Sequence, residues 1–146
     1  GIMPNAALQK IIEYSTLPGS SRHHWGTDID IIDASVKAPN NLLVESNYDE
    51  DGPYFELKKW MDKNAESYGF YLVYTKNSDR KGFKYEPWHY TYKPISEPML
   101  KAFKKIDLIA FYKNFELNGN QYLTKEFLVK YTSENVLDIN ASLLDN

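Results

Sequence analysis

The sequence contains no cysteine. Disulfides and thiolate chemistry are therefore excluded, and a bound metal would have to be held by histidine and carboxylate side chains. No apolar run approaches the roughly 18 residues of a membrane span, and residues 1–9 lack the basic start and apolar stretch of a signal peptide. The net charge of −3 argues against nucleic acid as a partner, because phosphate binding needs a basic face.

The pattern of apolar residues predicts a small mixed fold. Period-two alternation and aromatic runs predict three strands, over residues 28–33, 70–74 and 88–92. Helical spacing predicts helices over residues 6–14 and 53–68, and two more after residue 95. This order predicts the α+β class, with a small antiparallel sheet and flanking helices in one domain over residues 1–146.

The caps of the last two helices can also be predicted. Ser96 is expected to cap the first of them, and one stripe of that helix carries Met99, Phe103, Ile106 and Ala110. Thr124 is expected to cap the second.

The three histidines gather in two short segments, each beside acidic residues. His23 and His24 precede the strand that carries Asp30, and His89 follows Glu86 at a spacing of three. A hydrolytic zinc site needs three protein ligands, an open position and a nearby carboxylate as the base. In the alternative interpretation the histidines pack or lie on the surface and the acids are solvated. The spacing alone leaves both interpretations open and names no substrate.

Two segments resemble motifs of a known family. Residues 21–30, Ser-Arg-His-His-Trp-Gly-Thr-Asp-Ile-Asp, match Ser-x-His-x-x-Gly-x-Ala-x-Asp, and residues 86–89, Glu-Pro-Trp-His, match Glu-x-x-His. Together they resemble the D-alanyl-D-alanine carboxypeptidase and dipeptidase family, in the zinc peptidase group that includes lysostaphin-type enzymes and hedgehog domains. The resemblance covers residues 17–94, and residues 17–30 resemble a bacterial carboxypeptidase branch in particular.

The resemblance implies zinc as the cofactor and assigns three ligands to it: His23, Asp30 and His89. It implies Glu86 as the general base, and it favours His23 over His24 as the ligand. Ser21 matches a motif position near the substrate, and we expect it to form a hydrogen bond with the substrate or with a ligand.

The chain departs from the family pattern at two places. The usual alanine position is Asp28, which shares a strand face with Asp30, so we expect Asp28 either to contact the substrate or a ligand or to be a buried, paired acid. Family members also carry, upstream of the first motif, an arginine that binds and polarises the substrate, and no arginine precedes Ser21 here. We therefore expect that the domain lacks an N-terminal segment or that this branch lacks the arginine. Arg22 alternates with Ser21 and His23, so we expect it to point away from the metal.

The implied reaction is hydrolysis of D-alanyl-D-alanine, or of a related bond, in the stem peptides of peptidoglycan. Such substrates place the protein in the periplasm or outside the cell, as an inference from function. The metal motif does not set the cleaved bond, so a cell-wall endopeptidase or an L,D-carboxypeptidase stays open as an alternative. So does a zinc-stabilised binding module without catalysis, in which His24 or Asp28 would fill the water position. The presence of Glu86 argues against that module.

Overall fold

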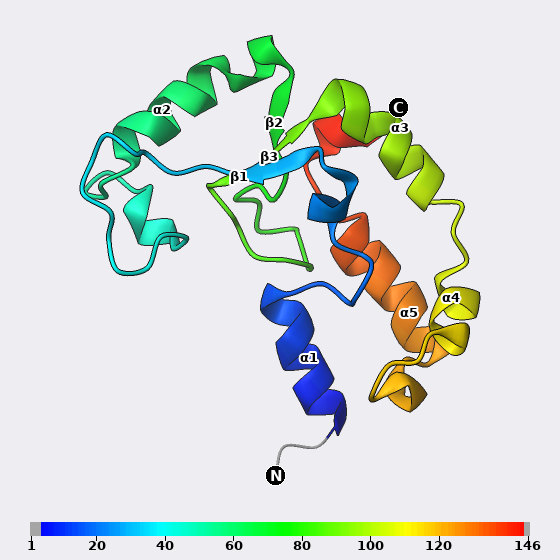
Figure 1. Cartoon of the computed structure of the whole chain (residues 1–146). Helices are drawn as coiled ribbons and strands as arrows, with labels where there is room; N and C mark the ends of the chain where they lie inside the picture. The colour runs from blue at the N-terminus through cyan, green and yellow to red at the C-terminus, as the bar shows by residue number, and fades with distance from the viewer. Residues whose placement is uncertain (1–3, 145–146) are drawn as a thin grey trace.

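A computed structural model describes residues 4–144, and a three-stranded antiparallel sheet lies at its centre (Figure 1). The strands are β1 (Asp28–Asp30), β2 (Phe70–Leu72) and β3 (His89–Tyr92), in the order β1-β3-β2. Because β3 is central, it is hydrogen-bonded on both edges, which fixes the direction of its side chains.

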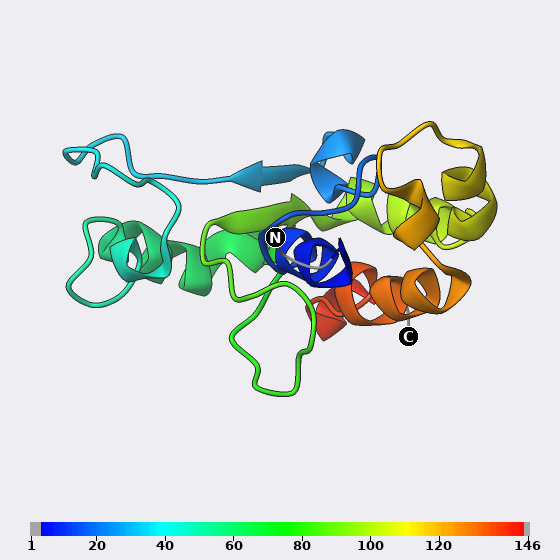
Figure 2. The same cartoon turned by 90° about the horizontal axis from the view of Figure 1, so that it is seen from below.

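Within residues 4–144, five α-helices flank the sheet. They are α1 (Pro4–Tyr14), α2 (Phe55–Asn64), α3 (Lys93–Phe103), α4 (Leu108–Asn114) and α5 (Lys125–Tyr131). Helix α2 lies on one side of the sheet and α3 to α5 lie on the other, as Figures 1 and 2 both show. The predicted α+β class with a small antiparallel sheet is thereby confirmed. Among the described residues, no helix is long and apolar enough to cross a membrane.

The main hydrophobic core lies between the sheet and the helices α3 to α5. Three tyrosines occupy it together with aliphatic residues, and each is at most 5% exposed: Tyr74, Tyr112 and Tyr131. A buried tyrosine hydroxyl needs a hydrogen-bond partner. Two of these hydroxyls find their partners in the loop that precedes His23, as described below.

The prediction for the segment after β3 was wrong. Helix α3 begins at Lys93, with Pro94 in its first turn, so Ser96 lies inside the helix and is buried. Proline is well suited to that position, because the first backbone N–H groups of a helix have no intrahelical partner. The predicted stripe is also broken. The helix ends at Phe103, and a new helix, α4, begins after Asp107, whose carboxylate accepts hydrogen bonds from the backbone of residues 109 and 110.

Other predicted boundaries are close to those of the structure. The first strand ends at Asp30 and does not reach residue 33. Thr124 does cap α5, by accepting a hydrogen bond from the backbone nitrogen of Phe127. Gly69 ends the turn that follows α2 with a φ of 82°, and a β-carbon there would lie 2.9 Å from the ring of Tyr92.

Candidate metal centre

The pairing of β1 with β3 brings two of the predicted ligands together. Asp30 lies directly opposite His89, and Asp28 lies directly opposite Thr91. Side chains alternate along a strand, so all four project from the same face of the sheet. Opposed side chains of neighbouring antiparallel strands have β-carbons about 4.5–5.5 Å apart. The strand register alone therefore places the carboxylate of Asp30 next to the imidazole of His89.

A tight turn places Glu86 beside His89. The backbone nitrogen of His89 donates to the carbonyl of Glu86 at 3.2 Å, which closes a turn over Pro87 and Trp88. The two side chains consequently meet, and Glu86 Oε2 lies 2.9 Å from His89 Nδ1. The spacing of three residues in this motif thus has a local geometric reason.

The loop that leads to Glu86 is held by Arg80, a partly buried residue whose side chain is only 7% exposed. The guanidinium of Arg80 donates to the backbone carbonyls of Thr75, Phe83 and Asp138, at 2.7–3.0 Å. The carboxylate of Asp138 in turn accepts hydrogen bonds from the backbone of residues 81 and 82. The loop between β2 and β3 is therefore fixed against the C-terminal part of the chain.

His23 reaches the same face from a short 3₁₀ helix, Arg22–Trp25. The hydroxyl of Ser21 caps this helix by accepting from the backbone nitrogen of His23. Gly26 ends the helix in the left-handed region, with a φ of 70°, and turns the chain into β1. His23 Nδ1 lies 3.2 Å from the backbone carbonyl oxygen of Asp28. Its other ring nitrogen, Nε2, faces Asp30 Oδ1 at 3.6 Å.

Two buried tyrosines from the C-terminal helices hold the loop before His23. The hydroxyl of Tyr131 accepts a hydrogen bond from the backbone nitrogen of Leu17 at 3.0 Å and lies 2.7 Å from Ser20 Oγ. The hydroxyl of Tyr112 donates to the carbonyl of Pro18 at 2.8 Å. Neither contact belongs to the predicted site, and no local pattern in the sequence indicates them, because the partners lie about a hundred residues apart.

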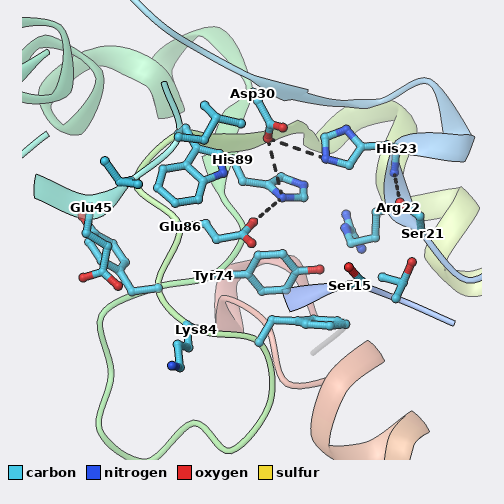
Figure 3. Close-up of a pocket in the computed structure, with 16 residues that line it drawn as sticks. Ser15, Ser21, Arg22, His23, Asp30, Glu45, Tyr74, Lys84, Glu86 and His89 are labelled. Atoms are coloured by element: carbon cyan, nitrogen blue, oxygen red, sulfur yellow. Dashed lines mark hydrogen bonds and ion pairs between the residues drawn. The ribbon is translucent and has the colours of Figure 1, made fainter. Parts of the chain in front are cut away.

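The structure thus brings three predicted ligands to one point. One donor atom each from His23, Asp30 and His89 lies within 4.8 Å of the others. Figure 3 shows these side chains and Glu86 pointing toward one another. His24 is exposed and lies outside this cluster. Two imidazole nitrogens and one carboxylate oxygen form a donor set that suits zinc.

The cluster lies in the wall of a cavity of about 790 Å³. This volume is within the usual range for small-molecule and peptide-end sites, about 300–1,000 Å³. Its lining includes polar side chains, among them Ser21 and Glu86, and apolar side chains, among them Leu43, Val44 and Trp88. A small peptide end would therefore find both an apolar surface and hydrogen-bonding groups beside the cluster.

The carboxylates around His89 favour the charged form of its ring. Burial opposes a charge on His89, but the hydrogen bonds with Asp28 and Glu86 outweigh it and raise the pKa of His89 to about 9. Burial alone would raise the pKa of Asp28, yet the hydrogen bond from His89 and the charge of Arg22 hold it below its usual value. Burial raises the pKa of Asp30. The carboxylates of Asp28 and Glu86 therefore stabilise a positive charge on the ring of His89.

Asp28 is a buried acid paired within the fold, and it also contacts the proposed ligand His89, so the two predicted alternatives hold together. Its side chain is fully buried and accepts hydrogen bonds from Arg22 Nε and His89 Nε2, both at 2.8 Å. The prediction that Arg22 points away from the site was wrong. Arg22 is 4% exposed, lies at the cavity wall and stacks on Trp25 at 4.6 Å. The alternation of side chains assumed for Arg22 does not hold, because residues 22–25 form a 3₁₀ helix rather than an extended segment.

Comparison with known proteins agrees with this arrangement. A family model for D-alanyl-D-alanine carboxypeptidases, VanY, matches residues 3–95, which include every residue of the cluster. The chain belongs to this carboxypeptidase family. Membership makes the chain a relative of peptidoglycan-directed hydrolases, and the family as a whole is generally metal-dependent.

Three individual proteins are also similar in sequence to this chain, and two of them are named as carboxypeptidases. An uncharacterized protein of Haemophilus influenzae is 32% identical over 105 residues, which cover 70% of this chain and 80% of that protein. A putative carboxypeptidase of Bacillus subtilis, YodJ, is 35% identical over 68% of this chain and 33% of its own length. A D-alanyl-D-alanine carboxypeptidase of Enterococcus faecium is 31% identical over 55% of this chain and 22% of its own length. The chain therefore spans only about a third or less of the two relatives named as carboxypeptidases. No solved structure matches significantly.

Proposed function

We propose that the chain is a zinc-dependent peptidase that hydrolyses D-alanyl-D-alanine, or a related bond, at the end of peptidoglycan stem peptides. The observation that carries the proposal is the convergence of His23, Asp30 and His89 within 4.8 Å, with the Glu86 carboxylate 2.9 Å from His89. A purely structural zinc site has four protein ligands and needs no base. Three donors beside a fourth side chain, the carboxylate of Glu86 at the cavity wall, instead match the needs of hydrolysis.

The proposed ligands are His23 Nε2, a carboxylate oxygen of Asp30 and His89 Nδ1, since these atoms face one another. When bound, zinc polarises a carbonyl and lowers the pKa of water to about 7. The protein supplies the rest of the chemistry. Both imidazoles are held by hydrogen bonds to Asp28, so their donor nitrogens are already directed at one point.

Glu86 is the proposed general base. Its carboxylate lies next to the ligand nitrogen of His89 and lines the cavity, so it can take a proton from water there. The same carboxyl group would then return that proton to the amine of the departing residue. We propose that Ser21 forms a hydrogen bond with the substrate backbone. The side-chain oxygen of Ser21 accepts a hydrogen bond from the backbone nitrogen of His23. No acceptor for the hydroxyl proton of Ser21 is found among the described residues.

The nature of the substrate places its site of action outside the cytoplasm, so we propose that the protein is periplasmic or exported. The stem peptide is its proposed partner. The apolar side chains at the cavity, among them Leu43 and Val44, would contact the methyl groups of the terminal alanines.

The proposal is tested with a pentapeptide that ends in D-alanyl-D-alanine. The zinc-loaded chain is incubated with this peptide, and the products are followed by mass spectrometry. We expect the loss of one terminal alanine. In Glu86→Gln the rate should fall by about 10²–10⁴-fold, the usual contribution of a general base. Glu50→Gln, the same change at an exposed loop position, serves as the control and should cleave at the unmodified rate.

Two other results would be informative. Cleavage at an internal bond would replace the carboxypeptidase with an endopeptidase and leave the role of Glu86 intact. Tight zinc binding without cleavage of any stem peptide would overturn the peptidase proposal.

A further inference from the structure

Both proposed ligand histidines form a hydrogen bond with the same residue, Asp28. His89 uses Nε2 to donate to the side-chain oxygen Oδ2 of Asp28 at 2.8 Å. His23 uses Nδ1 to donate to the backbone oxygen of the same residue at 3.2 Å. A carboxylate and a carbonyl can only accept, so each of these nitrogens has to carry its proton. The opposite nitrogen of each ring faces Asp30. In His89 this nitrogen, Nδ1, also lies 2.9 Å from the carboxylate of Glu86, so a metal that binds there has to displace its proton.

Asp28 is itself held in place from several directions. Its oxygen Oδ1 accepts from the hydroxyls of Thr27 and Thr91, and Oδ2 accepts from Arg22 Nε at 2.8 Å. A second guanidinium nitrogen, Nη2, donates to Thr91 Oγ1 at 3.3 Å. The carboxylate therefore cannot rotate away from His89 without breaking hydrogen bonds to Thr27, to strand β3 and to the 3₁₀ helix.

This network is poorly explained by stability alone. A buried ion pair is often no more stabilising than apolar side chains of the same size, because both charges lose their hydration. Here Oδ2 of Asp28 accepts hydrogen bonds from both the guanidinium of Arg22 and the imidazole of His89. The ion pair of Asp28 with Arg22 therefore also determines how the His89 ring is oriented. Hydrogen-bond partners of ligand imidazoles typically change metal affinity by 10–100-fold when they are removed.

We propose that Asp28, anchored by Arg22, is a positioning residue that sets which nitrogen of His23 and of His89 is presented to the metal. This inference rests on the proposed function, since it assigns a task to residues that contact its ligands. Asp28 acts through its side chain on His89 and through its backbone on His23. Only the first action is removed by substitution, so the effect of a substitution is expected at His89.

The test uses variants that leave no unpaired charge in the interior. Arg22→Met/Asp28→Leu replaces the pair with apolar side chains of similar length, and His89 loses its acceptor. Arg22→Met/Asp28→Asn also removes both charges but keeps an oxygen that can accept from His89. Zinc affinity is measured by competition with a chromophoric chelator, and thermal unfolding of the metal-free proteins reports on the fold.

We expect the Leu variant to bind zinc about 10–100-fold more weakly than the unmodified chain, and the Asn variant to recover most of that loss. A spectroscopic readout accompanies the affinities. The chain has only three histidines, so long-range ¹H–¹⁵N correlation spectra of the zinc-loaded protein resolve each ring. In the unmodified chain His89 should show a protonated Nε2 and a metal-bound Nδ1. In the Leu variant this pattern should be lost or mixed, while the pattern of His24 stays unchanged.

The outcomes separate the two proposals. If the unmodified chain binds no zinc, the proposed function fails and this inference fails with it. If it binds zinc, and the Leu variant binds within twofold and keeps the same His89 pattern, only the positioning role is overturned. Should the Leu variant not fold, Arg22→Met/Asp28→Ala decides, because it also removes the acceptor of His89 and leaves no unpaired charge. It should lower zinc affinity severalfold, whereas Asp51→Ala, at an exposed position, should not. An unchanged affinity in Arg22→Met/Asp28→Ala would refute the role.

Discussion

The hydroxyl of Tyr131 allows a quantitative test of how the cluster is supported. Tyr131 is 1% exposed, and its hydroxyl binds the backbone nitrogen of Leu17 and the side chain of Ser20. In Tyr131→Phe the N–H of Leu17, which is only 2% exposed, loses its acceptor. Ser20 is less affected, because its hydroxyl also lies 2.8 Å from the carbonyl oxygen of Leu17 and can donate to it. The variant therefore creates one buried, unpaired donor.

The expected loss follows from that count. One unsatisfied buried donor costs about 1–3 kcal/mol of the free energy of unfolding. With a urea m-value of about 2 kcal/mol/M, the unfolding midpoint should fall by roughly 0.5–1.5 M. Urea unfolding of the metal-free proteins, followed by circular dichroism, measures this shift without a contribution from bound metal.

Tyr68→Phe is the matched control, since Tyr68 is 64% exposed and no hydrogen bond of its hydroxyl is found among the described residues. It should unfold at the midpoint of the unmodified chain. A loss below about 0.5 kcal/mol in Tyr131→Phe, or an equal loss in the control, would refute the view that this hydroxyl holds the loop before His23.

Two further predictions concern the metal and the loop that carries Glu86. Zinc at a free concentration of 100 times its Kd should stabilise the chain by about 2.7 kcal/mol, or roughly 5–11 °C in Tm for a chain of this size. A chelator should reverse the gain, Asp30→Asn should lose most of it, and an equal gain in that variant would remove Asp30 from the ligand set. Arg80→Met should cost about 1–3 kcal/mol in urea unfolding, because it removes three hydrogen bonds to backbone carbonyls. It should lower kcat for the pentapeptide at least tenfold while the affinity for zinc changes less, and unchanged kcat would show that Arg80 does not set the position of Glu86.

Much of the cluster was predictable because its geometry is local or follows from simple periodicity. The alternation along residues 28–30 sets Asp28 and Asp30 on one face, and antiparallel pairing then places His89 opposite Asp30. The turn from Glu86 to His89 involves only four residues. The error at Arg22 has the same origin, because the rule of alternation was applied where the chain is helical.

Contacts across long stretches of sequence were not predictable from one chain. The hydrogen bond between Leu17 and Tyr131 joins residues 114 positions apart, and the bond between Tyr112 and Pro18 spans 94 positions. A tyrosine on a helix face gives no sign of whether its hydroxyl meets water or a distant carbonyl. The start of α3 was missed for another reason, since Ser96 was expected to cap the helix but Pro94 already lies in its first turn.

The proposed ligands and many of the residues that support them come from different parts of the chain, so the motifs alone do not describe this site. The family match ends at residue 95, and every residue of the metal cluster precedes that point. Of the fourteen buried residues in the main core cluster, however, nine follow it. The two tyrosine hydroxyls that hold the loop before His23 also come from this later part, on α4 and α5. The geometry of the first motif therefore depends on helices that the motif does not include. Substitutions in those helices should weaken zinc binding without contacting the cluster.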